Sequence, residues 1–191
     1  VLGQADLGYK DYLYLTLSAR NDWSSTLPID KNSFFYGGVN LSFLLTELMP
    51  ELKASQVNFL KVRAAVGQTG NDTEVFRTSS WFNTLTNNTY YYTHLPIGGV
   101  SGLSEHNRLP NTELKPEMTT EYELGVSGSF FNNRVSVDLA YYNKQTKNQI
   151  IAATLPPETG YTTETKNVGK IENKGIELML EVTPVRTKDW E

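Results

Sequence analysis

Residues 121–142 read EYELGVSGSFFNNRVSVDLAYY. Two segments of this stretch alternate between apolar and polar side chains, and Phe131-Asn132-Asn133-Arg134 separates them. Because successive side chains of a strand point to opposite faces of a sheet, the alternation predicts two strands that each have one apolar face. Asparagine tolerates the positive φ that tight hairpins need, so the separating residues predict a turn between antiparallel strands.

The same alternation recurs on both sides of this hairpin, and residues 1–9 are expected to add a partial strand. The apolar positions of the other alternating segments are Leu13, Leu15, Leu17 and Ala19; Phe35, Val39, Leu41 and Phe43; Leu60, Val62, Ala64 and Val66; and Ile176, Leu178, Leu180 and Val182. We therefore predict an all-β fold of antiparallel up-and-down strands.

The connections between these segments are alternately short and long. Residues 9–12 predict a tight turn, and residues 44–58 predict a short helix or an irregular link on the same side, whereas residues 21–32, 69–117 and 154–167 predict long loops. Short turns on one side and long loops on the other are typical of a transmembrane barrel, whose tilted strands need about 9–11 residues each. Soluble sandwiches alternate in the same way, so a soluble carbohydrate-binding β-sandwich is the alternative.

Composition excludes several classes of protein. A net charge of −4 argues against nucleic-acid binding. The absence of cysteine and the presence of only two histidines exclude thiolate and three-histidine metal sites within these residues. Mean hydropathy is −0.40 and no apolar run approaches the roughly 18 residues of a transmembrane helix. A barrel remains compatible with these values, because only every second strand residue need be apolar.

We expect no cofactor, no metal ligand and no catalytic residue, and hence no enzyme. The glycines lack the following helix that a nucleotide site requires. Glu121 and Glu123 lie about 7 Å apart on one strand face, a spacing that an inverting glycoside hydrolase could use. We favour instead the interpretation that they line a polar, solvated face together with Glu177 and Glu181.

Aromatic residues gather in the longest predicted loop, at Trp81, Phe82, Tyr90, Tyr91, Tyr92 and His94. Aromatic rings stack on sugars or on peptide side chains, so Trp81, Tyr90, Tyr91 and Tyr92 are the candidate ligand-binding residues. The alternative, which we favour, is that they pack the loop onto itself or onto a partner.

Lys61 and Arg63 share one strand face. They are candidates for holding an anionic ligand or another domain of the same protein. Balancing nearby carboxylates is the interpretation that we favour for them.

Four stretches resemble the SusC/RagA-type TonB-linked outer-membrane transporters, in the order and spacing of that family. They are RNDWSSTL (20–27), KVRAAVGQTGN (61–71), LKPEMTTEYELG (114–125) and NVGKIENKGIEL (167–178). The resemblance implies that residues 1–191 are one partial barrel domain, from the C-terminal half of a barrel of about 22 strands around a plugged lumen. No plug domain or TonB box is recognised within these residues.

The resemblance also implies a function. Such proteins lie in the outer membrane of Gram-negative, Bacteroidetes-type bacteria, in contact with its lipid, and import glycan or peptide oligomers. They work with a SusD-like surface lipoprotein, and the TonB complex acts on them through the plug domain.

Overall fold

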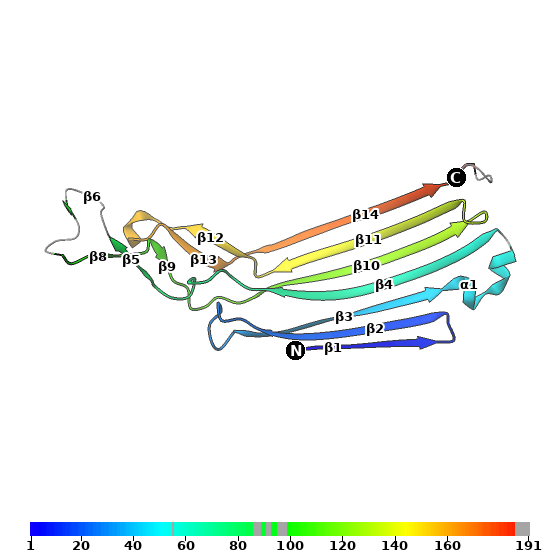
Figure 1. Cartoon of the computed structure of the whole chain (residues 1–191), viewed down its shortest axis with the longest axis horizontal. Helices are drawn as coiled ribbons and strands as arrows, with labels where there is room; N and C mark the ends of the chain where they lie inside the picture. The colour runs from blue at the N-terminus through cyan, green and yellow to red at the C-terminus, as the bar shows by residue number, and fades with distance from the viewer. Residues whose placement is uncertain (55, 86–88, 91–92, 95–98, 186–191) are drawn as a thin grey trace.

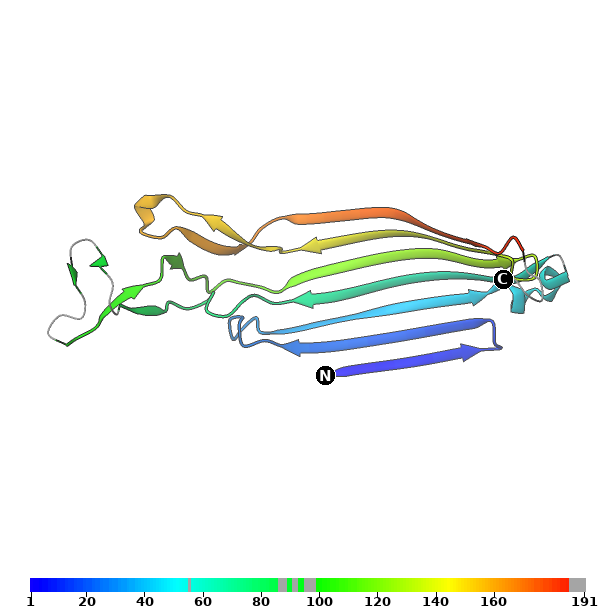
Figure 2. The same cartoon turned by 45° about the horizontal axis from the view of Figure 1, so that its top comes forward.

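The computed structural model describes residues 1–54, 56–85, 89–90, 93–94 and 99–185, and for residues 54, 85, 89–90 and 93–94 it describes the backbone alone. Seven long strands form one antiparallel sheet in the order β1-β2-β3-β4-β10-β11-β14. Their bounds are β1 Leu2–Tyr9, β2 Leu13–Trp23, β3 Ser33–Leu44, β4 Val57–Asn71, β10 Glu117–Phe130, β11 Val135–Lys147 and β14 Lys170–Val182. The predicted antiparallel all-β fold is confirmed, because each predicted strand is present and adjacent strands run in opposite directions (Figures 1 and 2).

One end of the sheet carries two tight turns and one helical link (Figure 1, right). Lys10 and Asp11 have φ values of 47° and 56°, as the tight turn between β1 and β2 requires. Phe131, Asn132 and Asn133 all have positive φ in the β10–β11 turn. Helix α1 (Leu45–Leu48) and the 3₁₀ turn η1 (Pro50–Ala54) join β3 to β4. The predicted turns and link are therefore confirmed.

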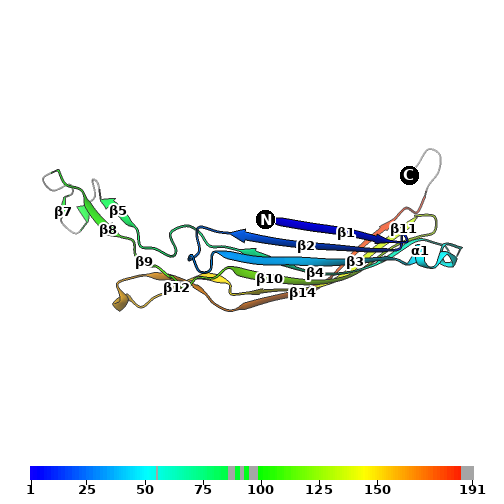
Figure 3. The ribbon, with the colours of Figure 1, turned by 90° about the horizontal axis from the view of Figure 1, so that it is seen from below.

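The long connections lie at the opposite end and contain small sheets of their own (Figure 3). Their elements are β5 (Phe82–Leu85), β6 (Thr89–Tyr90), β7 (Thr93–His94), β8 (Gly102–Glu105), β9 (Arg108–Leu109), β12 (Ile150–Thr154), η2 (Pro157–Thr159) and β13 (Thr163–Asn167). The bounds differ from the expected loops 21–32, 69–117 and 154–167, since the connections cover residues 24–32, 72–116 and 148–169. The long strands reach further into the first two connections, because Trp23 pairs with Ser33 and Asn71 pairs with Glu117, where polar side chains hide the alternation. The third connection is longer than expected, because β12 and β13 pair in a separate small sheet.

The long strands form a single layer. A β-sandwich needs a second sheet packed over one face, and no such sheet covers the long strands in the described part of the chain (Figures 1 and 3). The soluble-sandwich alternative is therefore wrong for this fold. Among the described residues no helix combines the length and apolar character needed to span a bilayer.

Candidate functional site

The two faces of the seven-stranded sheet differ sharply in charge. The register places the following ionisable residues on one face, here called the charged face: Asp6, Arg20, Asp22, Lys61, Arg63, Glu117, Glu121, Glu123, Asp138, Lys144, Glu177 and Glu181. On the other, apolar face, the charges of the described strands are confined to the loop end, at Lys147, Lys170, Glu172 and Lys174. The apolar face is otherwise uncharged in the described strands and is rich in Leu, Val, Ile and aromatic residues, many of which are exposed in this chain.

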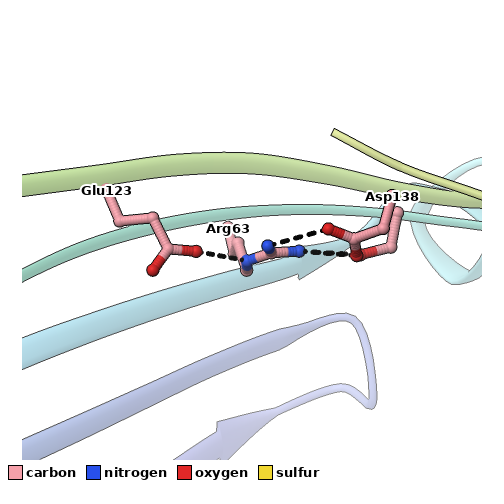
Figure 4. Close-up of polar contacts among 4 residues, drawn as sticks. Arg63, Glu123 and Asp138 are labelled. Atoms are coloured by element: carbon pink, nitrogen blue, oxygen red, sulfur yellow. Dashed lines mark hydrogen bonds and ion pairs between the residues drawn. The ribbon is translucent and has the colours of Figure 1, made fainter. Parts of the chain in front are cut away.

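Arg63 of β4 is the centre of a polar cluster on the charged face (Figure 4). Its Nε donates to Glu123 Oε1 at 2.8 Å, and its two terminal nitrogens donate to the two carboxylate oxygens of Asp138 at 2.9 and 3.0 Å. Arg63 also donates to the Ser127 hydroxyl at 2.9 Å, and this hydroxyl donates to Asp138. Four of the five guanidinium N–H donors are therefore used within the sheet, as the favoured interpretation of charge balance expects.

The glycine at position 125 explains how Arg63 spans the sheet. Gly125 of β10 pairs with Arg63 and lies between it and β11. A Cβ atom on Gly125 would lie 2.5 Å from Arg63 Cζ, closer than real Cβ contacts come. Only glycine therefore leaves room for the side chain to lie flat across β10.

Glu121 and Glu123, the carboxylates that a glycoside hydrolase could use, each lie next to a different cation. Glu123 accepts from Arg63, whereas Glu121 lies 3.9 Å from Lys144 Nζ. Both line the charged face, as expected from the favoured interpretation. Glu177 and Glu181 of β14 lie on the same face.

The long connections form one assembly at the end of the sheet, here called the loop platform (the described residues of 24–32, 72–116 and 148–169). Strand β9 pairs with β13, so residues 108–109 lie beside 163–164. The Asn111 side chain donates to the Thr165 carbonyl. The Asn167 side chain accepts a hydrogen bond from the backbone N–H of Lys115 and donates one to the backbone carbonyl of Lys115. Sequence reasoning missed these two asparagines. Asn111 lies just before the LKPEMTTEYELG stretch and Asn167 begins the NVGKIENKGIEL stretch, and these positions are the sequence features that could have pointed to them.

The loop platform has a small core and is tied to the β2–β3 connection. Leu114 is fully buried and Leu27 is 4% exposed. Asp72 accepts hydrogen bonds from the Ser24 and Thr26 hydroxyls, which joins the start of the 72–116 connection to residues 24–26. These contacts tie the first residue of the 72–116 connection to the neighbouring connection.

A second tie joins the same two connections. Lys31 Nζ donates to Glu113 at 2.5 Å. This bond lowers the pKa of the Glu113 carboxyl and raises the pKa of Lys31.

A cavity of about 280 Å³ opens where the loop platform meets the charged face. It is lined by Asn71, Asp72, Thr73, Glu74, Arg77, Arg108, Glu117, Ile150, Ile151, Ala152 and Thr165. Sequence reasoning did not single out Arg77 or Arg108, because isolated arginines in a long loop carry no spacing signal.

Trp81 precedes β5, and strands β5 and β8 belong to the arm of the loop platform that reaches furthest from the sheet (Figures 1 and 3). Trp81 stacks with His106 at 4.4 Å and with Phe76 at 5.9 Å between ring centroids. The structure describes only the backbone of Tyr90 and His94, and Tyr91 and Tyr92 lie outside the described residues. Trp81 thus packs within the loop, and its role in ligand contact stays a prediction.

Known proteins resemble this chain along its length. Residues 1–191 match the family model described as TonB dependent receptor-like, beta-barrel. TonB-dependent receptor P26 of Formosa agariphila is 33% identical over 98% of this chain, and SusC of Bacteroides thetaiotaomicron is 28% identical over 52% of it. These matches cover 18% and 10% of the two relatives, so the chain spans less than a fifth of their length.

Solved structures agree on the fold. A structure of the RagAB peptide importer superposes with a TM-score of 0.85 at 23% identity, covering 98% of this chain and 20% of that chain. The siderophore receptor PirA of Pseudomonas aeruginosa gives a TM-score of 0.60 at 19% identity, covering 93% of this chain and 29% of that chain. At these identities the likeness concerns the fold alone.

Proposed function

This chain belongs to the TonB dependent receptor-like β-barrel family, and from that premise we propose that it forms part of an outer-membrane transporter that imports glycan or peptide oligomers. The predicted SusC/RagA-type resemblance is confirmed by the family match and by the similarity to SusC, and the expected barrel fold is confirmed by the family match and the superposition on RagAB. The proposed site of action is the outer membrane of a Gram-negative, Bacteroidetes-type bacterium.

The division of the sheet into a charged and an apolar face is the observation that carries this proposal. In a barrel the apolar face contacts lipid, and the charged face lines a water-filled lumen. Leu178 and Leu180 are more than 60% exposed in this chain, and a lipid environment would cover them.

Aromatic residues flank the apolar face at both ends, as they do at the two interfaces of membrane barrels. Toward the loop end they are Trp23, Phe35, Tyr122 and Tyr141, and toward the turn end they are Tyr9, Phe43 and Phe130. Leu15 and Leu124 lie in the same row of paired residues across the sheet. Measured from this row toward the loop end, Trp23 lies eight residues along β2, whereas Tyr122 lies only two residues along β10. The aromatic band therefore crosses the sheet obliquely, which is the geometry of strands tilted in a bilayer.

The proposed mechanism is capture of the oligomer by the loop platform and the aromatic loop residues Trp81, Tyr90, Tyr91 and Tyr92, followed by passage along the charged face. No covalent chemistry is involved. The proposed partners are the TonB complex, acting through a plug domain, and a SusD-like surface lipoprotein that covers the loop platform.

A hairpin on the outermost arm offers a surface for that lipoprotein. Strands β5 and β8 place Phe82 and Leu103, at 58% and 68% exposure, on one face together with Thr84 and Glu105. Asn83 and Ser104 occupy the opposite face of the same hairpin. Burial of two exposed apolar side chains favours docking at the first face.

Uptake by cells tests the transport proposal. In a Bacteroidetes strain that lacks the full-length gene, we expect lost uptake of fluorescently labelled oligosaccharides or oligopeptides. The full-length gene should restore it, but not in cells without TonB. Unchanged uptake of both classes in the deletion strain would refute the proposal.

Copurification tests the partner. A SusD-like lipoprotein should copurify with the tagged full-length transporter, and the double change Phe82→Asp and Leu103→Asp should release it. The matched double change Asn83→Asp and Ser104→Asp should not. Equal release by both variants would place the contact elsewhere, and no copurifying lipoprotein at all would refute the partner.

A further inference from the structure

We propose that the cavity lined by Arg108 is a subsite for a carboxylate group of the imported oligomer. The inference deepens the proposed function, on which it rests, because it assigns a chemical group to the loop platform. The carboxylate belongs either to an acidic sugar or to a peptide, and Arg108 is the residue that binds it.

The cavity lies on the path proposed for the oligomer. Asn71 and Glu117 form the last pair between β4 and β10 at the loop end, and both lie on the charged face. Asn71 lies eight residues from Arg63 along β4, and Glu117 lies six residues from Glu123 along β10. Strand β12 supplies an apolar wall through Ile150 and Ile151. The cavity therefore opens where the lumenal face meets the loop platform, and its volume of about 280 Å³ accommodates one sugar or one amino-acid residue.

The three carboxylates of the lining are already engaged by protein donors. Glu74 pairs with Arg77. Asp72 accepts from two hydroxyls of the β2–β3 connection. Glu117 accepts from the Ile150 N–H at 2.5 Å and from the Asn71 side chain at 3.1 Å.

Asp72 and Glu117 accept from neutral donors and keep their charge, whereas Arg108 differs from all three carboxylates because its side chain has no direct partner among the described residues. Its Nε is buried and has no hydrogen-bond partner, and the guanidinium forms no ion pair with any residue that the structure describes. An unpaired buried donor is costly, and each buried donor is normally satisfied. The planar fork of a guanidinium matches a carboxylate through two parallel hydrogen bonds, so a ligand carboxylate would satisfy Arg108.

Binding by the purified full-length transporter tests this assignment and distinguishes the two sources. The probes are triglycine against triglycinamide, and trigalacturonate against its methyl ester, measured by calorimetry. We expect one acid to bind about tenfold or more tightly than its neutral counterpart, the effect of one charge-assisted contact. The pair that shows the preference identifies the ligand as peptide or acidic glycan.

Two variants locate the effect. Arg108→Gln should abolish the preference for the acid, whereas Lys115→Gln removes the same charge from the loop platform outside the cavity lining and should keep it. Equal affinities within both pairs, or a preference that survives Arg108→Gln, would overturn the inference.

Crystallography gives a second readout that does not depend on affinity for an oligomer. Crystals of the full-length transporter soaked in 3-bromopropionate should show an anomalous bromine peak in the cavity with the wild type and none with Arg108→Gln. A peak absent from the cavity, or unaffected by the substitution, would contradict the assignment. Neither measurement uses transport, so uptake without an acid preference refutes only the subsite, and an acid preference without uptake refutes only the transport function.

Discussion

Arg63 on β4 reaches Asp138 on β11 across the strand between them, and binds both oxygens of its carboxylate at 2.9 and 3.0 Å. One side chain thereby ties three consecutive strands together on the charged face (Figure 4). Bidentate pairs of this kind fix geometry as well as adding energy. The cluster therefore helps to hold β4, β10 and β11 in register on the charged face.

Removing the arginine should destabilise the barrel. Arg63→Met leaves Asp138 and Glu123 without their cation, and we expect a loss of about 1–3 kcal/mol in unfolding free energy, because these hydrogen bonds are charge-assisted and the side chain is only 23% exposed. Unfolding of the full-length protein in lipid bilayers, followed by tryptophan fluorescence in guanidinium, measures this loss.

Lys61 is the matched control, since it lies two residues away on the same face and forms no ion pair among the described residues. Lys61→Met should change stability by no more than about 0.5 kcal/mol. Equal effects of the two substitutions would show that general charge, and not the Arg63 cluster, stabilises this face.

Gly125→Ala should act through Arg63. The new methyl group would occupy the place of the guanidinium, so we expect a loss close to that of Arg63→Met, about 1–3 kcal/mol. In the Arg63→Met background the same change should cost little, because the two substitutions remove one interaction. Gly67→Ala is the control on the neighbouring strand, where no atom lies within 4 Å of the added Cβ. Additive effects at positions 125 and 63 would contradict this account of the glycine.

The long strands and their faces were predictable from sequence because each rests on a local rule. Alternation assigned Leu124 and Leu178 to one face and Glu123 and Glu177 to the other, and the register confirms both. The hairpin at residues 131–134 followed from the φ preference of asparagine. Such rules need no knowledge of distant partners.

The loop platform and the Arg63 cluster could not be predicted, because they depend on residues far apart in the chain. Asn111 and Asn167 bind backbone groups 54 and 52 residues away. Strand β12 is apolar on both faces, and β13 is almost wholly polar, so neither alternates. Alternation placed Lys61 and Arg63 together, but only the space above Gly125 decides which of them reaches Asp138.

The contact between Lys31 and Glu113 predicts a pH response outside the membrane. The folded protein lowers the Glu113 pKa, so the ion pair is formed above the ordinary glutamate range and is lost as the pH falls through the lowered value. Lys31→Met should move the Glu113 pKa back up toward its ordinary value. Carboxyl ¹³C NMR measures this shift, with the signal assigned by its loss in Glu113→Gln. A Glu113 pKa unchanged by Lys31→Met would rule out the ion pair.

The opposite environments of two neighbouring residues test the barrel assignment most directly. Leu178 faces the apolar side of β14 and Met179 the charged side, and both are about two-thirds exposed in this chain. In the full-length protein folded into lipid bilayers, Leu178→Lys should cost about 2–4 kcal/mol near the bilayer midplane. Met179→Lys should be tolerated, because the lumen is solvated. A large loss from Leu178→Lys alone is the result that lipid contact predicts, and equal tolerance of both lysines would contradict it.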